Sequence, residues 1–324
     1  MHGIKKILFI TLSNIGDVVL TLPVFGMLKN EFPAADIAVM TGSPAARELF
    51  EQDPRVKEVI IYDKRARFSQ KLGLGLRLRK KKFDLVVDLR NSIFPVLAGA
   101  RYSTFSLVSR DERGLHRKDK HLARLKKFGL VTDKAGFPVY FNDADKNRVK
   151  LLLKELGIST GDRIVAVSAG AKSHTKRWPV KGFIDLCKRL AVKMGVRVLL
   201  IGDKSDAAIN KEIASAGING VYDITGRTNL RELAYLLSLS RLLVTNDSAP
   251  LHVASSVNTP TVAIFGPTDH KKYGPLAQRS AVVRKGLLCS PCGEPQCKFN
   301  TLACILQISD DEVWDAIHNG PGTI

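Results

Sequence analysis

The sequence predicts an α/β protein of two doubly wound domains, and three observations support this fold class. The chain has 324 residues, which is more than one domain usually holds. Apolar runs of strand length alternate with longer amphipathic segments in both halves, as parallel sheets with crossover helices require. A charged segment ends at Gly157, and a second alternating series begins after it. We therefore expect domains at residues 1–157 and 158–324 that face each other across a cleft.

The expected strands are short apolar runs bounded by polar or turn residues. In the first half they span residues 7–12, 36–40, 56–61 and 83–89. In the second half they span 163–168, 196–201, 221–224, 241–244 and 261–265. Helical periodicity predicts helices at 18–32, 121–128 and 144–156, and near 180–194, 205–216 and 230–237. Ligands of doubly wound domains bind at the carboxyl ends of the strands, so functional residues should lie in the loops that follow them.

Composition excludes several classes of protein. With 45% hydrophobic and 25% charged residues the chain is an ordinary globular protein. Asn14, Gly16 and Asp17 interrupt the only early apolar stretch, which is too short to span a bilayer. Residues 1–10 resemble a signal peptide only superficially, because no small-residue cleavage site follows them. Five cysteines do not make a disulfide scaffold in a chain of this length, so we expect a reducing, cytoplasmic compartment.

The formal charge of +19 is concentrated in the first half of the chain. Basic residues crowd segments 64–67, 77–82 and 110–127. The positive electrostatic potential of these segments favours an anionic partner, although each segment alone is also typical of a solvated surface. Nucleic acid is the less favoured partner, because aromatic residues that could stack on bases are only 7% of the chain.

A polar turn separates the expected strands 241–244 and 261–265. It reads Thr245-Asn246-Asp247-Ser248-Ala249-Pro250-Leu251-His252, and Gly266-Pro267-Thr268-Asp269 follows the second strand. A polar turn that opens a helix offers free backbone N–H groups and the helix dipole to an anion, most often a phosphate. The alternative is that Asp247 or Ser248 merely caps the helix. The second turn, and a histidine one helical turn after Ser248, favour a ligand site.

Two other loops follow expected strands and carry charged residues. Asp17, after the first strand, could accept a proton from a substrate hydroxyl, or it could be a helix N-cap. Its loop lacks G-x-G-x-x-G spacing, so no nicotinamide or flavin cofactor is expected. In the second half, Gly170 and Ala171 leave room for a ligand near the backbone, and Lys176 offers a charge to phosphate oxygens. The alternative for Lys176 is an ordinary exposed lysine.

Together these motifs resemble the ADP-heptose:lipopolysaccharide heptosyltransferases of glycosyltransferase family 9. The resemblance runs in order over nearly the whole chain and is carried by Ile15-Gly16-Asp17, Gly170-Ala171, Lys176-Arg177-Trp178-Pro179, residues 226–237, Asn246 to His252, and Phe265-Gly266-Pro267-Thr268. It implies a GT-B architecture of two Rossmann-like domains. The first would hold the acceptor and the second the nucleotide sugar, and the last helix could pack back on the first domain.

The resemblance also implies roles for individual residues in an inverting transfer. Asp17 matches the general base, and Lys176 matches the lysine at the donor diphosphate. Asp247, Ser248 and Ala249 match the turn whose backbone amides hold that diphosphate, and His252 matches the histidine one turn later. Gly170 and Ala171 would lie beside the donor, Thr228 in the adenine pocket, and Asp206 near the ribose. Neither a metal nor a cofactor besides the donor, ADP-heptose, is implied.

The implied acceptor is the anionic inner core of lipopolysaccharide, which the basic first half could receive. We therefore expect an enzyme that is peripheral on the inner face of the cytoplasmic membrane and does not bind nucleic acid. Ala249 and Ala169 depart from the family, where many relatives have Gly and Pro. The alternatives are another nucleotide-sugar enzyme of the same architecture, with a different donor or an epimerase activity, and a basic nucleic-acid-binding protein.

Two features stay open at the level of sequence. Cys289, Cys292, Cys297 and Cys304 form C-x2-C-x4-C-x6-C, which could close a zinc site or be reduced structural thiols. His121 could contact an acceptor phosphate, although the start of a helix is the favoured interpretation.

Overall fold

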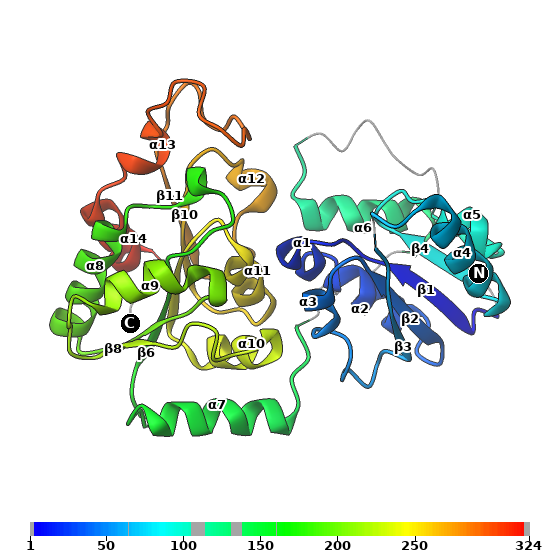
Figure 1. Ribbon diagram of the computed structural model, residues 1–324, viewed down its shortest axis with the longest axis horizontal. Helices are drawn as coiled ribbons and strands as arrows, with labels where there is room; N and C mark the ends of the chain where they lie inside the picture. The colour runs from blue at the N-terminus through cyan, green and yellow to red at the C-terminus, as the bar shows by residue number, and fades with distance from the viewer. Residues whose placement is uncertain (1–2, 64, 105–113, 131–137, 160, 321–324) are drawn as a thin grey trace. The chain divides into compact units, whose positions relative to one another are not determined.

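The computed structural model describes residues 3–63, 65–104, 114–130, 138–159 and 161–320. Lys64 and residues 110–113 of the basic segments therefore lie outside the described residues. The chain divides into two compact units, Met1–Tyr140 and Phe141–Ile324. Each unit is a parallel sheet covered by helices, which confirms the predicted α/β fold (Figure 1).

The first unit has a five-stranded sheet in the order β3-β2-β1-β4-β5. Residues Ile7 to Ile10 of the central strand are fully buried, because helices cover both faces of a parallel sheet. The strand order reverses between β1 and β4, so the loops after these two strands flank the switch point. The strands are β1 (Lys6–Ile10), β2 (Asp36–Thr41), β3 (Glu58–Ile61), β4 (Leu85–Asp88) and β5 (Tyr102–Ser103).

Six described helices surround this sheet. The predicted helix 18–32 is in fact two helices, since Pro23 in the first turn of the second has no N–H with which to continue the first. Phe25 packs against Phe9 and Phe50 and anchors that second helix on the sheet. The helices are α1 (Ile15–Val19), α2 (Leu22–Glu31), α3 (Pro44–Arg47), α4 (Phe68–Lys80), α5 (Phe94–Ala98) and α6 (Arg117–Lys127).

The second unit has a six-stranded parallel sheet in the order β11-β10-β9-β6-β7-β8. Its switch point lies between β6 and β9. Five strands match predicted runs, and β11 is an additional edge strand. The strands are β6 (Ile164–Ser168), β7 (Arg197–Leu200), β8 (Val221–Asp223), β9 (Leu242–Asn246), β10 (Thr261–Phe265) and β11 (Ser280–Arg284).

Helices on both faces complete the second unit. They are α7 (Asp143–Glu155), the short η2 (His174–Lys176), α8 (Val180–Lys188) with its continuation η3 (Arg189–Lys193), the short η4 (Lys204–Asp206), α9 (Ala207–Ala214), α10 (Leu230–Leu239), α11 (Ala249–Ser256), α12 (His270–Tyr273), α13 (Ala303–Leu306) and α14 (Asp310–Asn319). In the part of the chain that the structure describes, no helix is both long enough and apolar enough to cross a membrane.

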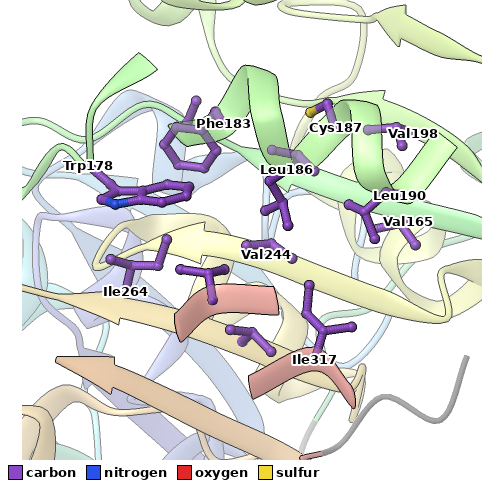
Figure 2. Close-up of a cluster of buried hydrophobic side chains, with 14 of the residues drawn as sticks. Val165, Trp178, Phe183, Leu186, Cys187, Leu190, Val198, Val244, Ile264 and Ile317 are labelled. Carbon is purple, nitrogen blue, oxygen red and sulfur yellow. The ribbon is translucent and has the colours of Figure 1, made fainter. Parts of the chain in front are cut away.

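The last helix packs on the second unit itself. Val244 and Ile264 of the sheet, Phe183 and Leu186 of α8, and Ile317 of α14 belong to one buried cluster (Figure 2). The Trp178 indole N–H donates to the carbonyl of Ile308, at 2.8 Å, just before α14. Within the second unit, α14 packs on α8, β10 and β11. That the last helix also packs back on the first domain stays a prediction.

The division between the units falls after Tyr140, before the predicted boundary at 157. Helix α7 belongs to the second unit because it packs on α10. The buried Asp145 carboxylate accepts from the Arg231 guanidinium at 3.0 Å, and the rings of Phe141 and Tyr235 are 5.3 Å apart. The glycine that ends α7 gives a sequence signal for the end of the helix but none for the sheet on which that helix packs.

Candidate active site

An ion pair bridges the switch point of the second unit. Lys176 lies in η2, after β6, and Asp247 directly follows β9. The Lys176 Nζ is 2.6 Å from Asp247 Oδ2, and the side chains are 32% and 6% exposed. Pairing is expected for such a deeply buried carboxylate, because an isolated charge there would be costly. The fold thus brings together two residues that are 71 positions apart in the sequence.

Asn246 ties the same two loops together. Its side-chain oxygen accepts from the backbone N–H of Trp178 at 3.1 Å, and its amide nitrogen donates to the carbonyl of Ala169 at 2.8 Å. The Arg177 Nε donates to the carbonyl of Ala171 at 2.8 Å. The loop after β6 is therefore bonded to the end of β9, where the Lys176 amine meets Asp247. Sequence reasoning assigned no role to Asn246.

Asp206 packs against the backbone of Gly170. A Cβ at Gly170 would lie 2.0 Å from Asp206 Oδ1, and one at Gly202 would lie 2.7 Å from Asp206 Oδ2. Burial and the nearby Asp203 raise the pKa of Asp206, although Arg177 opposes this effect. The room that we predicted beside Gly170 is thus filled, on its Cβ side, by a carboxylate of the same unit. Ala171 follows in the same loop and is buried.

The turn after β9 does not cap its helix with a side chain. Ser248 is the N-cap residue of α11, but its hydroxyl makes no capping bond within the described residues and lies 3.1 Å from the Thr245 hydroxyl. Asp247 is engaged with Lys176 instead. Ala249 begins the helix, and His252 is buried one turn further on. This arrangement leaves the backbone N–H groups of the turn without the side-chain cap that was the alternative interpretation.

Thr228 is placed away from this pair. It is half-buried in the segment between β8 and α10, and β8 is separated from β6 by β7. It lies on the same carboxyl edge of the sheet as Lys176, because all these strands are parallel. The structure thus gathers Lys176, Asp247, Ser248 and Ala249 at the switch point and leaves Thr228 toward the sheet edge.

In the first unit, Asp17 follows β1 at the switch point. It is the third residue of α1, whose N-cap residue is Asn14, so Asp17 is not the N-cap. Its carboxylate is half-buried and accepts from the Asn14 amide at 3.0 Å. The side chain therefore remains within reach of solvent at the edge where ligands of doubly wound domains bind.

Arg90 faces the same edge from the end of β4 and was missed by sequence reasoning. Its guanidinium carbon is 5.1 Å from the centre of the Tyr62 ring, and its buried Nη1 has no hydrogen-bond acceptor among the described residues. A Cβ at Gly42 would lie 2.7 Å from this Nη1 and 2.5 Å from the Ser13 Oγ. Loops from β1, β2 and β4 thus meet around Arg90. An arginine directly after a buried strand was the available signal.

His121 is buried inside α6 and does not begin it, since the helix starts at Arg117. Burial, together with the charges of Arg124, Arg117, Lys120 and His116, lowers the pKa of His121 to about 3. The imidazole is neutral near pH 7 and carries no charge to attract a phosphate.

The cysteines near the C-terminus are free thiols. Burial and the neighbouring Cys292, Cys289 and Cys297 raise the pKa of Cys304. In the ranges that the structure describes, no group of three or more His, Cys, Asp or Glu side chains has the geometry to hold a metal ion.

Two Rossmann-like units with polar loops at their switch points define the GT-B architecture. The model of glycosyltransferase family 9 (heptosyltransferase) matches residues 72–303, and the chain belongs to this family. Lipopolysaccharide heptosyltransferase 2 of Escherichia coli K12 is 28% identical over 86% of this chain and 88% of its own length.

Solved structures show the same fold. A family 9 glycosyltransferase from Veillonella parvula matches with a TM-score of 0.82 at 22% identity, over 97% of this chain and 96% of its own. The ADP-heptose heptosyltransferase II of Escherichia coli matches with a TM-score of 0.78 at 23% identity, over 97% and 98% of the two chains.

Proposed function

We propose that this glycosyltransferase moves heptose from ADP-heptose to a hydroxyl of the lipopolysaccharide inner core, with inversion. Family membership and the heptosyltransferases similar to it over most of the chain support the donor and acceptor classes. The observation that carries the mechanism is the Lys176 amine held at the switch point beside the uncapped turn of α11. This combination suits a diphosphate, because a fixed cation and helix N–H groups converge on one place.

We assign the donor to the second unit. Lys176 and the backbone of the Asp247-Ser248-Ala249 turn would contact the diphosphate, with Gly170, Ala171 and His252 beside it. Thr228, nearer the sheet edge, suits a contact with the nucleoside. Lysine and the helix dipole can offset phosphate charge without a metal, so we propose that none is used.

We assign the acceptor to the first unit, with Asp17 as general base. Its half-buried carboxylate would take the proton of the attacking hydroxyl. The buried Nη1 of Arg90 lacks an acceptor among the described residues, and this favours an anionic group of the substrate in that place. A carboxylate or phosphate on the inner-core acceptor meets this requirement.

The reaction then balances as a single displacement. The acceptor oxygen forms a bond to the anomeric carbon of heptose while the bond from that carbon to the ADP oxygen breaks. The hydroxyl proton passes to Asp17, and the electron pair leaves with ADP, whose growing charge Lys176 offsets. Attack opposite the leaving group inverts the anomeric configuration. Since the acceptor is carried by a lipid, we propose that the enzyme works at the inner face of the cytoplasmic membrane.

A transfer assay tests the proposal directly. ADP-heptose is supplied with lipid acceptors that are truncated at successive core sugars, and ADP release and the anomeric configuration of the product are measured. We expect release with one acceptor length and inversion in the product. Turnover of a different nucleotide sugar, with no release from ADP-heptose on any acceptor, would contradict the proposed donor. Retention of configuration would contradict the single displacement.

A further inference from the structure

Helix α4 carries a line of large apolar side chains on its outer face. Phe68, Leu72 and Leu76 are 71%, 40% and 54% exposed. Residues spaced by four lie above one another on a helix, so these three form one continuous stripe. Val96 of α5, the helix that packs against α4, is also exposed (Figure 1). Single exposed apolar residues are ordinary, whereas an aligned set marks an interaction surface.

The opposite face of α4 is firmly packed. Leu78 is fully buried in the core of the first unit. A Cβ at Gly75 would lie 2.6 Å from Leu97 Cδ1, so this glycine lets α4 and α5 approach closely. The outward direction of the stripe therefore follows from how the helix is fixed on its unit, and the stripe cannot turn inward without losing this packing.

The stripe is surrounded by positive charge. Between Asp63 and Asp84 the sequence has nine basic residues and no acidic one. Leu76, at the end of the stripe, also lines an open depression of about 750 Å³ together with Arg79, Lys80, Lys82 and Arg101. Within the described residues none of these four cations forms an ion pair. The one acidic residue in the lining, Asp84, is occupied by the backbone N–H groups of Lys5 and Lys6, each at 2.9 Å.

We propose that the α4 surface, defined by the stripe and these four cations, docks on a bilayer that contains anionic phospholipid. The apolar side chains enter the interface between headgroups and acyl chains, while the cations bind lipid phosphates. A nucleic acid would satisfy the cations but would leave the aliphatic part of the stripe in water, and Phe68 alone offers little stacking surface. The choice of a membrane as partner rests on the proposed lipid acceptor.

Vesicle flotation with the full chain and no donor tests the surface. Vesicles of phosphatidylcholine with anionic phosphatidylglycerol are compared with vesicles of phosphatidylcholine alone. We expect binding to the anionic vesicles, with at least tenfold weaker binding to the neutral ones. The triple variant Phe68→Gln, Leu72→Gln, Leu76→Gln should bind the anionic vesicles roughly tenfold or more weakly at any ionic strength, because its side chains no longer bury apolar surface in the membrane interface. The triple variant Arg79→Gln, Lys80→Gln, Lys82→Gln should weaken vesicle binding by a similar factor, mainly at low salt.

Matched controls lie on exposed positions of the second unit. Val192→Gln, Phe299→Gln, Leu306→Gln is the apolar control, and Lys181→Gln, Lys188→Gln, Lys211→Gln is the charge control. Equal losses in the controls and the α4 variants would overturn the proposal, as would equal binding to both kinds of vesicle. Tighter binding of the wild type to duplex DNA than to anionic vesicles would also overturn it. All altered side chains are exposed, and a thermal unfolding measurement on each variant checks that it is folded.

The experiment separates this proposal from the proposed reaction. If the protein floats with anionic vesicles but transfers no heptose, the docking surface is supported and the proposed reaction is contradicted. If the protein transfers heptose to a detergent-dispersed acceptor but the α4 substitutions do not change its flotation, the reaction is supported and the docking surface is contradicted.

Discussion

The two switch points of the molecule differ in how completely their polar groups are satisfied. In the second unit, Lys176 pairs with Asp247, and Asn246 bonds to two backbone groups of the facing loop. In the first unit, Asp17 receives one bond from Asn14, and the buried Nη1 of Arg90 has no acceptor among the described residues. The charged side chains Lys176 and Asp247 of the second unit are thus paired in advance, whereas a buried guanidinium nitrogen of the first unit has hydrogen-bonding capacity left for a ligand.

This difference suits the two substrates that we propose. A diphosphate is a compact, constant group, and preformed charges stabilise it without reorganisation when negative charge develops on the leaving group. An acceptor must be oriented so that one hydroxyl meets the base, and part of its binding then comes from groups that stay unpaired until it arrives. Substitutions at each switch point can test this division between a donor edge whose charges are already paired and an acceptor edge completed by its ligand.

The largest effect is expected at Asp17. The Asp17→Asn variant keeps the size of the side chain but cannot accept the hydroxyl proton, so kcat should fall by about a thousandfold. Binding of ADP, measured by calorimetry, should stay within about twofold of wild type, because the donor is assigned to the other unit. As a control, Asn14→Ala removes only the bond to the carboxylate and should cost less than about tenfold. A kcat within tenfold of wild type in Asp17→Asn would exclude Asp17 as the base.

At the donor edge, Lys176→Ala should weaken ADP binding by about 10- to 100-fold, since a bond between charged groups contributes roughly 1.5–3 kcal/mol. The same change leaves the Asp247 carboxylate buried without its partner, and unfolding in urea should show a loss of about 1–3 kcal/mol. The double variant Lys176→Ala, Asp247→Asn separates the two effects. It should recover much of the stability but none of the ADP affinity. Unchanged affinity in Lys176→Ala would show that this lysine serves only to neutralise Asp247.

The parts of the fold that sequence reasoning found are those decided locally. The central strands are apolar on both faces, so their runs stand out, and the rule that ligands bind after parallel strands led to Asp17, Lys176 and Asp247. The two-residue β5 and the edge strand β11 were not predicted, because a short or half-covered strand has no distinctive apolar pattern.

Contacts between distant loops were not predictable in the same way. Asn246 and Ala169 are 77 positions apart, and they meet only because β6 and β9 are neighbours in the sheet. Gly42 and Arg90 meet for a similar reason, through the order β2-β1-β4. Strand order is a property of the whole domain, so the partner of a side chain at the switch point cannot be inferred from local pattern.

Alanine substitutions at Gly170 of the second unit and Gly42 of the first compare the two edges more finely. Alanine at position 170 would place its Cβ 2.0 Å from a carboxylate oxygen of Asp206, which is itself held by the Asp203 N–H at 3.1 Å. We expect a loss of stability of about 1–3 kcal/mol. Alanine at position 42 would lie 2.5 Å from the Ser13 Oγ and 2.7 Å from the Arg90 Nη1, which are ends of side chains that can rotate away, so stability should change less than at position 170. The displaced Arg90 should instead raise the acceptor KM several-fold, with kcat and ADP binding nearly unchanged.

Adding the substitution Asp206→Ala tests the cause of the expected loss of stability in Gly170→Ala. It removes the carboxylate that the new methyl group would meet, so Gly170→Ala should cost much less stability in that background. Chemical denaturation of the four proteins gives the coupling between the two positions. If Gly170→Ala costs the same stability in both backgrounds, Gly170 is not needed to make room for Asp206. If the acceptor KM is unchanged in Gly42→Ala, Gly42 is not needed to position Arg90.

The smallest effect concerns the neutral imidazole of His121, one helical turn before Arg124, whose guanidinium donates to the Leu89 carbonyl at the acceptor edge. The pKa of His121 is about 3 in the folded protein and 6.5 in its ordinary state, so the unfolded chain binds a proton that the folded one rejects. Relative to His121→Leu, the wild type should therefore keep its full stability above about pH 6.5 and lose about 1.4 kcal/mol per pH unit below it. Urea unfolding at about pH 7 and pH 5 should give a difference near 2 kcal/mol between the two conditions, with exposed His318→Leu as the control. A pH-independent difference would mean that folding does not lower the pKa of His121, and stability that rises as the pH falls would mean that the folded protein favours the charged imidazole. The second result would restore His121 as a candidate contact for an acceptor phosphate.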